Sequence, residues 1–329
     1  MNLQLYPLKF HPFFKEKIWG GSKIRTHLDK DFSPLPNCGE TWEISGVEGN
    51  VSIVSEGDLE GTSLTGLIDK FGEDLLGRQV VAKYGMEFPL LIKFIDADQD
   101  LSIQVHPDDI MAAREHQGKG KTEMWYVLQA DEEASLYAGF KQLIDHREYV
   151  KRVEEKTITE VLEKVPVEAG DVFYIPAGRV HSIGRGVLLA EIQQTSDLTY
   201  RIYDFDRCDE KGNKRELHTE LAVQAIQFEV KDDYKTPYRL RPNEVCSVVE
   251  CPFFSTQLIE LEGEMIRDLS SIDSFVIYIC TRGKGILICD EHETIFRKGD
   301  VVLIPASFKS IELLTSDSCT LIETFIPET

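Results

Sequence analysis

Alternating and continuous apolar runs, broken by Gly, Pro and Asn, dominate the chain and predict a mainly β protein. Residues 5–57 contain several such runs, for example TWEISGVEGNVSIVSEG from Thr41, which we interpret as strands and hairpins. Strands resume at Phe88, where PLLIKFIDADQDLSIQVHP gives a buried strand, an Asp-rich turn and a second strand that stops at Pro107. The run MWYVLQADEEASLYAGF from Met124 again has the character of strands.

Three segments depart from the strand pattern and predict helical insertions. They cover about residues 63–86, 141–165 and 217–228. In the first of them, apolar residues recur at helical intervals, and Ser63 precedes them as a candidate N-cap. The polar segment 107–122 contains two glycines and is expected to be a loop or an insertion.

Residues 170–181, GDVFYIPAGRVH, predict a strand closed by a tight turn that delivers His181 to a defined place. Gly178 tolerates a positive φ and the proline before it cannot donate to a strand ladder, so the chain can bend sharply there. The spacing resembles the second signature of the cupin family, whose histidine is a metal ligand inside a small β-barrel. A second copy, GDVVLIPASFKS, begins 129 residues later at Gly299 and carries Ser310 in place of the histidine.

The repeat predicts two related domains with different chemistry. We expect two cupin-like β-barrel (jelly-roll) domains: a catalytic one over residues 1–235, which holds the helical insertions, and a second one over residues 236–329. The boundary is placed in the Pro- and charge-containing connector KDDYKTPYRLRPNE. Because a serine hydroxyl is a poor metal ligand, the C-terminal barrel is expected to be free of metal.

Charge and cysteine content limit the partners and the compartment. The 329-residue chain has a formal net charge of -21, which disfavours nucleic acid and anionic membrane surfaces as partners. Its seven cysteines are odd in number and form no CxxC pair, which indicates reduced thiols and a cytoplasmic location. No signal peptide or membrane-spanning segment is predicted, and the protein is expected to be a monomer or a weak homo-oligomer.

Four side chains from separate predicted strands form a candidate metal site. Gln104 and His106 are two apart on one strand and therefore share a face, Glu123 begins the next strand, and His181 comes from the turn. Two imidazoles, one carboxylate and one amide oxygen suit Zn²⁺, with Mn²⁺, Fe²⁺ or Co²⁺ as alternatives. We therefore expect one zinc ion per chain.

Several motifs together resemble the type I mannose-6-phosphate isomerase (phosphomannose isomerase) family in its shorter bacterial form. They are WGG, GETWEISG, QVHP, KTEMWYV, IPAGRVHSIG and EIQQTSDLTYRIYDFDR. The resemblance spans about residues 19–207. It implies that the zinc ligands are Gln104, His106, Glu123 and His181, and that Arg201 is the active-site arginine. The implied reaction is the interconversion of mannose 6-phosphate and fructose 6-phosphate through a cis-enediol intermediate.

Such a reaction needs a group that moves a proton between C1 and C2 and groups that stabilise charge on O1 and O2. Arg201, Lys121, Glu191 and Asp197 are the catalytic candidates, and the sequence does not select the base among them. Arg201 is suited either to the phosphate or to the enediolate, or else forms an ion pair with Asp204 or Asp206.

The substrate-binding candidates are Arg201, Lys121, Lys93 and Ser102. Lys93 stands in the apolar run PLLIKFI, where a lysine is costly unless it faces a polar cavity. A lysine close to a metal ion also loses its proton more readily and is then a candidate base. Ser102 shares the strand face of the candidate metal ligands and is placed to donate to a phosphate oxygen.

Two other functions fit parts of this pattern. His106, Glu123 and His181 match the two-histidine, one-carboxylate triad of non-haem iron oxygenases, although Gln104 as a fourth ligand occupies a position that oxygen chemistry needs open. A sugar-phosphate-binding cupin without turnover is the second alternative, and the intact set of charged residues would suit it as well.

Overall fold

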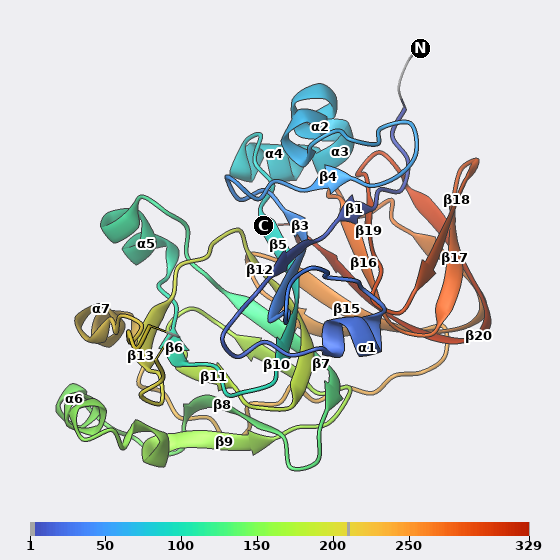
Figure 1. Cartoon of the computed structure of the whole chain (residues 1–329). Helices are drawn as coiled ribbons and strands as arrows, with labels where there is room; N and C mark the ends of the chain where they lie inside the picture. Colours follow the sequence, from blue (N-terminus) through green and yellow to red (C-terminus); the bar gives the residue numbers. More distant parts are fainter. Residues whose placement is uncertain (1–3, 209–210, 329) are drawn as a thin grey trace.

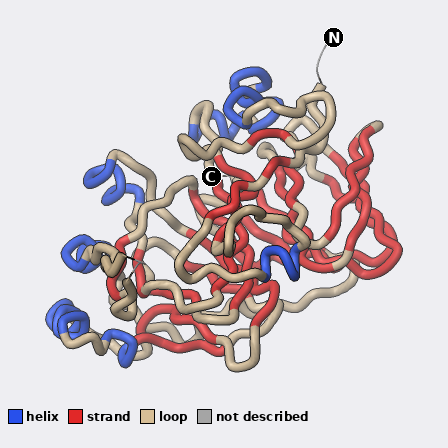
Figure 2. Tube along the Cα trace, viewed as in Figure 1, coloured by secondary structure: helices blue, strands red, loops and turns tan. Residues whose placement is uncertain are grey.

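The chain is mainly β, and most of its strands lie in three antiparallel sheets. The structure, a computed structural model, describes residues 4–208 and 211–328. The first two sheets, of six and five strands, come from the first two thirds of the chain, and a seven-stranded sheet comes from the last third. In Figure 1 the C-terminal sheet lies on one side of the molecule and most helices lie along the opposite and upper margins. The tube in Figure 2 shows how much of the centre consists of strands.

The six-stranded sheet forms the centre of the molecule and has the order β10-β7-β12-β5-β3-β2. Its strands are β2 (Phe13–Lys15), β3 (Glu40–Ser45), β5 (Leu90–Ala97), β7 (Glu123–Ala130), β10 (Val172–Ile175) and β12 (Val187–Gln194). Every residue of β5 and β12 is buried, in keeping with their continuous apolar sequences. These buried strands carry one pair of opposite charges: Lys93 of β5 lies opposite Glu191 of β12.

The five-stranded sheet has the order β13-β6-β11-β8-β9. Its strands are β6 (Ile103–Val105), β8 (Ser135–Phe140), β9 (Leu162–Pro166), β11 (His181–Ile183) and β13 (Tyr200–Tyr203). In its register, Gln104 of β6 lies opposite His181 of β11 on one side and opposite Arg201 of β13 on the other. Three residues far apart in sequence are therefore brought side by side.

The C-terminal sheet repeats the strand and turn pattern of residues 170–181. It consists of β14 (Val245–Glu250), β15 (Ser255–Asp268), β16 (Val276–Arg282), β17 (Lys284–Cys289), β18 (His292–Arg297), β19 (Val301–Ile304) and β20 (Ser310–Phe325). A further pair, β1 (Phe10–His11) and β4 (Ile53–Val54), forms a two-stranded sheet. Strand β19 and the start of β20 follow β10 and the start of β11 at the same offset as the two sequence copies. The repeat is therefore structural.

One buried apolar cluster connects the two parts of the chain. It contains residues of the first half, such as Leu8 and Phe88, together with Phe275 and Leu303 of the C-terminal sheet. Leu8 also bridges Leu303 through backbone hydrogen bonds of 2.8 and 2.9 Å. Whether the chain divides at residue 235 stays a prediction.

Helices form in all three segments expected to contain them. Residues 63–86 hold α2 (Leu64–Phe71), α3 (Glu73–Leu76) and α4 (Arg78–Tyr84); the later two segments hold α6 (His146–Glu154), the 3₁₀ helix η1 (Ile158–Val161) and α7 (Thr219–Ala225). Ser63 caps α2 as expected, because its hydroxyl accepts a hydrogen bond from the Gly66 N–H. The helical expectation was wrong for residues 162–165, which belong to β9 and pair with β8.

Two helices lie where the sequence predicted none. Helix α1 (Lys23–Leu28) falls among the N-terminal strands, and α5 (Asp109–His116) lies in the segment expected to be a loop. Asp108 stabilises the start of α5, since its side chain accepts from the Met111 N–H. Only Met111 and Ala112 of this helix are buried, which is why its sequence lacks an apolar periodicity. Among the described residues, no helix has the length and apolar character needed to cross a membrane.

Candidate active site

Three buried side chains converge where the first two sheets face each other. His106 follows β6, Glu123 begins β7 and His181 begins β11, and one potential ligand atom from each lies within 4.8 Å of the others. Gln104, expected to be the fourth ligand, places Nε2 at 3.2 Å from His181 Nε2. The structure thus brings together all four side chains that the sequence predicted as a metal site.

Backbone contacts fix the orientation of both imidazoles. His106 Nδ1 donates to the Leu198 carbonyl and His181 Nδ1 donates to the Arg179 carbonyl, each at 2.8 Å. His106 Nε2 lies 3.5 Å from Glu123 Oε2 and accepts from Lys121 Nζ at 3.2 Å, whereas His181 Nε2 lies 3.4 Å from Glu123 Oε1. Such anchoring of the outer ring nitrogen is typical of metal-binding histidines.

The turn before His181 depends on glycine. Gly178 has a φ of 88°, and a Cβ there would lie 2.9 Å from the carbonyl oxygen of Ala225. Its N–H donates to the backbone carbonyl of His106 at 2.9 Å, so the turn is tied directly to another candidate ligand. The prediction that Gly178 supplies the bend to His181 is confirmed.

Burial controls the charge state of the three convergent groups. Burial lowers the pKa of His181 to about 3 and holds the pKa of His106 well below its usual value, and the charge of Lys121 adds to both effects. Burial, followed by repulsion from Glu191, raises the pKa of Glu123 to about 7, although Lys121 opposes the shift. Both imidazoles are therefore neutral near pH 7, which is the form that binds a metal ion.

The donor set fits a divalent metal ion. Among the described residues, Glu123 Oε1 is one of the few buried side-chain oxygens without a hydrogen-bond partner. This oxygen lies beside His181 Nε2, and an unpartnered buried carboxylate oxygen is costly unless a cation or another donor binds there. A half-turn of the Gln104 amide would add its oxygen to this set. Two nitrogen and two oxygen donors suit zinc and its neighbours in the first transition series.

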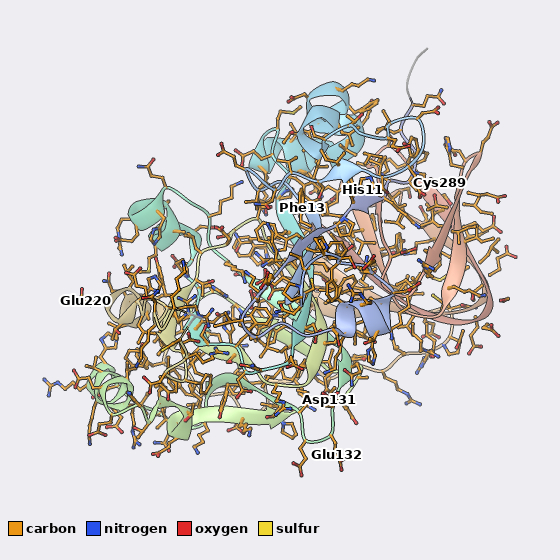
Figure 3. All side chains as sticks on the ribbon, viewed as in Figure 1. His11, Phe13, Asp131, Glu132, Glu220 and Cys289 are labelled. Atoms are coloured by element: carbon orange, nitrogen blue, oxygen red, sulfur yellow. The ribbon has the colours of Figure 1, made fainter. Side chains whose placement is uncertain are left out.

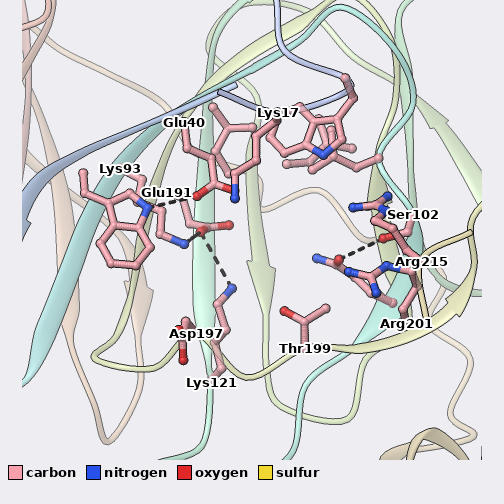
Figure 4. Close-up of a pocket in the computed structure, with 16 residues that line it drawn as sticks. Lys17, Glu40, Lys93, Ser102, Lys121, Glu191, Asp197, Thr199, Arg201 and Arg215 are labelled. Carbon is pink, nitrogen blue, oxygen red and sulfur yellow. Dashed lines mark hydrogen bonds and ion pairs between the residues drawn. The ribbon is translucent and has the colours of Figure 1, made fainter. Parts of the chain in front are cut away.

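A cavity of about 350 Å³ opens beside these residues. It is lined by Lys17, Trp19, Glu40, Trp42, Lys93, Ile95, Leu101, Ser102, Gln104, Lys121, Ile183, Glu191, Asp197, Thr199, Arg201 and Arg215. Figure 4 shows Arg201, Arg215 and Ser102 on one side, and Lys93, Glu191 and Glu40 on the other. The full set of side chains in Figure 3 shows how closely the surrounding parts of the molecule are packed.

One side of the cavity carries an alternating series of buried charges. Glu191 Oε1 lies 3.3 Å from Lys93 Nζ and 3.7 Å from Lys121 Nζ, and Lys121 also contacts Glu123. Glu191 accepts a hydrogen bond from Trp125 Nε1 at 2.9 Å. Burial alone would lower the pKa of Lys93, but Glu191 and Glu40 raise it. These carboxylates favour the charged form of Lys93, and the base role considered for a lysine close to a metal ion stays a prediction.

The other side of the cavity carries Arg201, but without the acidic partner considered for it. Arg201 Nη1 donates to the Glu216 carbonyl at 2.9 Å, and its backbone N–H donates to His218 Nδ1 at 3.1 Å. Asp204 pairs instead with Arg207 and Arg215, and Asp206 pairs with Lys156 and Lys214. The ion-pair alternative for Arg201 is therefore wrong.

Two family models match this chain over separate ranges. Residues 7–141 match the model "Phosphomannose isomerase type I, catalytic domain", and residues 244–326 match "Mannose-6-phosphate isomerase, cupin domain". The chain is 35% identical to mannose-6-phosphate isomerase ManA of Bacillus subtilis, over 93% of this chain and 95% of that protein. It is 35% identical to mannose-6-phosphate isomerase of Streptococcus mutans, over 95% and 98%.

A solved structure shows the same fold throughout. The crystal structure of the mannose 6-phosphate isomerase from Bacillus subtilis aligns with a TM-score of 0.87 at 33% identity, over 97% of this chain and 99% of that one. This chain belongs to the type I phosphomannose isomerase family. The resemblance carried by its sequence motifs is confirmed, and so is the mainly β, cupin-like fold with helical insertions.

For this phosphomannose isomerase family member, every cavity residue singled out from sequence lies at the site. Ser102, Lys93, Lys121, Glu191, Asp197 and Arg201 all line the cavity. Glu191 contacts Lys93 and Lys121 rather than Arg201. Asp197 is exposed and has no hydrogen-bond or ion-pair partner among the described residues.

Polar residues of the cavity that the sequence interpretation missed include Lys17, Glu40, Trp42 and Arg215. Glu40 accepts from Trp42 Nε1 at 2.9 Å and pairs with Lys17 at 3.1 Å. Strand alternation in GETWEISG places Glu40 and Trp42 on one face, which was the signal available for them. Arg215 lies in a connection after β13 whose sequence has no periodicity, so no comparable signal existed.

Proposed function

We propose that this phosphomannose isomerase family member is a zinc-dependent aldose–ketose isomerase. It interconverts mannose 6-phosphate and fructose 6-phosphate through a cis-enediol intermediate. The observation that carries the proposal is the buried His106–Glu123–His181 cluster beside a cavity lined by lysine and arginine side chains. The names of the similar proteins from Bacillus subtilis and Streptococcus mutans support the choice of substrate.

Gln104, His106, Glu123 and His181 would hold one zinc ion per chain. When bound, zinc supplies Lewis-acid stabilisation of negative charge on substrate oxygens without redox chemistry. The orphaned Glu123 Oε1 and the two Nε2 atoms beside Glu123 support this ligand set. In the C-terminal copy, the exposed Ser310 supports a count of one zinc ion rather than two.

Lys93 and Lys121 would bind the oxygens at the C1–C2 end of the sugar. Both ammonium groups are buried, at 7% and 5% side-chain exposure, and Glu191 lies within ion-pair distance of each. A buried cation fixed in this way stabilises developing oxyanion charge, because little reorganisation is needed when the charge forms. Glu191 would thus act by holding the two lysines in place.

Asp197 would carry the proton between C1 and C2. An exposed carboxylate on the cavity wall with no partner among the described residues is available to accept a proton, whereas the carboxylate of Glu191 is engaged by two lysines and Trp125. Arg201 would stabilise the enediolate or bind the phosphate, and Ser102 would donate to a phosphate oxygen. Arg201 Nε has no partner among the described groups, which supports a role in binding an anion.

A coupled assay of mannose 6-phosphate turnover on metal-defined protein tests the proposal. Treatment with EDTA should abolish fructose 6-phosphate release, and addition of one equivalent of zinc should restore it. Stoichiometric iron with substrate-dependent oxygen uptake would replace the isomerase by the oxygenase. Metal-loaded protein that binds mannose 6-phosphate but never releases fructose 6-phosphate would establish the binding-protein alternative.

We also propose that the enzyme works in the cytoplasm and acts on a small-molecule substrate. All seven cysteines are free thiols, including Cys280 and Cys319, whose sulfur atoms lie 3.8 Å apart without a bond. Free thiols at this proximity support a reducing compartment. The expected monomer or weak homo-oligomer stays a prediction.

A further inference from the structure

A second guanidinium stands beside Arg201 on the cavity wall. Arg215 lines the same cavity and is fixed by Asp204, which accepts from Arg215 Nε at 2.8 Å and from Nη2 at 2.5 Å. Asp204 itself is only 5% exposed. A bidentate contact of this kind fixes the plane of the guanidinium. It uses two of the five N–H donors and leaves three for another partner.

The charges at this end of the cavity do not balance. One carboxylate, Asp204, serves both Arg215 and Arg207, which donates to it at 2.5 Å. Arg201 adds a third positive charge, and its Nε is buried without a partner among the described residues. Burial, followed by the nearby charge of Arg215, lowers the pKa of Arg201. Like charges held together in this way are costly until an anion binds between them.

Other charged groups nearby do not neutralise the excess of positive charge around Arg201 and Arg215. Glu216 meets Arg201 through its backbone carbonyl, and its side chain is exposed. Asp100 meets Arg207 through its backbone carbonyl, and the Asp100 carboxylate accepts from the Arg185 N–H. Asp197 also lines the cavity, but in Figure 4 it lies near Lys121 and away from the two arginines.

We propose that Arg215 is a specificity residue that binds the phosphate group of the substrate together with Arg201. The inference rests on the proposed function and fixes the direction of the substrate in the cavity. The phosphate would lie between the guanidinium groups, near Ser102, and the C1–C2 end would lie toward Lys93 and Lys121. Figure 4 shows these two groups of side chains on opposite sides of the cavity. Asp204 is then a positioning residue that orients Arg215.

Arg207 provides a matched control within the same cluster. It shares the Asp204 carboxylate and carries the same charge, yet its Nη1 turns to the Asp100 carbonyl, and it is not among the residues lining the cavity. Substitution of either arginine by glutamine removes one positive charge next to Asp204. Only the loss of Arg215 removes a donor from the cavity.

The test compares R215Q, R215K and R207Q with the wild-type enzyme, using mannose 6-phosphate turnover and binding of inorganic phosphate by calorimetry. R215Q should raise KM for mannose 6-phosphate about 30-fold or more, with kcat changed less than about threefold, because a charge-assisted contact to the phosphate is lost. Phosphate affinity should fall by a similar factor, with partial rescue in R215K. Zinc content and melting temperature, measured in each variant, report any loss of the fold.

R207Q should leave KM and phosphate affinity within about twofold of wild type, since it removes charge outside the cavity. Equal effects of R207Q and R215Q, or unchanged phosphate affinity in folded R215Q, would overturn the proposal. Binding of inorganic phosphate is measured without turnover of the substrate. A wild-type enzyme that fails to isomerise mannose 6-phosphate would therefore contradict the proposed function, whereas the R215Q comparison would still decide on the anion site.

Discussion

The two strand–turn–strand copies share a backbone pattern and differ at the proposed metal ligands. In the first copy Ile175 of β10 pairs with Glu123, and the turn leads to His181, which is 1% exposed. In the second copy the equivalent Ile304 of β19 pairs with Val276, and the turn leads to the exposed Ser310. A valine and a serine thus replace the carboxylate and the imidazole. The turn belongs to the scaffold, and the proposed metal chemistry depends on particular side chains.

Both copies nevertheless keep a buried carboxylate at the same strand position. Glu191 lies opposite Trp125 and accepts from its indole, and Glu323 lies opposite Tyr278 and accepts from its hydroxyl at 2.5 Å. Glu191 faces lysines that line the cavity. Glu323 instead forms an ion pair with Arg267, whose guanidinium donates to both carboxylate oxygens at 2.8 and 2.9 Å.

The difference shows how the same scaffold becomes either an active site or a structural unit. The Arg267 guanidinium satisfies Glu323 and also donates to the Asp268 carbonyl and to Gln257 Oε1, so this ion pair is engaged by groups of the protein itself. The lysines around Glu191 remain at a cavity wall, where further polar groups of a substrate can join the network.

Substitution of His181 is the most severe test of the difference between the two copies. H181A should lose its zinc and at least about 100-fold in kcat/KM, because metal sites lose affinity strongly even when only supporting contacts are removed. The matched change S310A in the second copy should alter neither metal content nor activity. Full zinc occupancy of H181A, measured by atomic emission on folded protein, would remove His181 from the ligand set.

Substitution of Arg201 tests the contribution of the cavity to activity independently of the proposed metal centre. R201A should keep its zinc and lose about 100-fold or more in kcat/KM, since it removes a charged donor from the site where negative charge develops or binds. Steady-state kinetics with a parallel zinc measurement checks this. Near-normal kcat/KM would exclude Arg201 from the mechanism.

Substitution of Arg267 tests the closed network in the second copy. R267M should lower the free energy of unfolding by about 3 kcal/mol, because it leaves Glu323, which is fully buried, without its cation. The double variant R267M/E323L should recover part of this loss. Activity per folded molecule should be unchanged at temperatures where the variants stay folded. Urea unfolding that matches wild type would show that the pair contributes nothing.

Acid should weaken the interactions of Glu40 with Lys93 and Lys17 at the cavity wall. Burial would raise the pKa of Glu40, but Lys93 and Lys17 lower it from 4.5 to about 2. A depressed pKa stabilises the fold above the unfolded value, and this stabilisation is lost as the pH falls from about 4.5 toward 2. The stability difference between wild type and E40Q, up to about 3 kcal/mol near pH 6, should therefore shrink by pH 3. A difference that is constant from pH 6 to 3 would contradict the assigned pKa.

Much of this arrangement was predictable because it depends on short-range patterns. Strand periodicity places Gln104 and His106 on one face, and the glycine turn fixes where His181 emerges. The family motifs then connected these residues with Glu123 and Arg201. All four candidate ligands meet in the structure as the sequence predicted.

The remaining features depend on contacts that sequence patterns do not encode. Helix α5 is held by the Asp108 cap rather than by an apolar face. Arg215 reaches the cavity through its pairing with Asp204, eleven residues earlier in the chain. The partnership of Glu323 with Arg267 replaces a cavity by an ion pair, and nothing in either strand sequence alone indicates that choice.

A count of metal ions per chain tests the central claim most directly. Native mass spectrometry of wild-type protein isolated without chelators should show one zinc ion per chain, lost in H181A and retained in S310A. Two ions per chain, or one ion that persists in folded H181A, would contradict the proposal that only the first copy forms a metal centre.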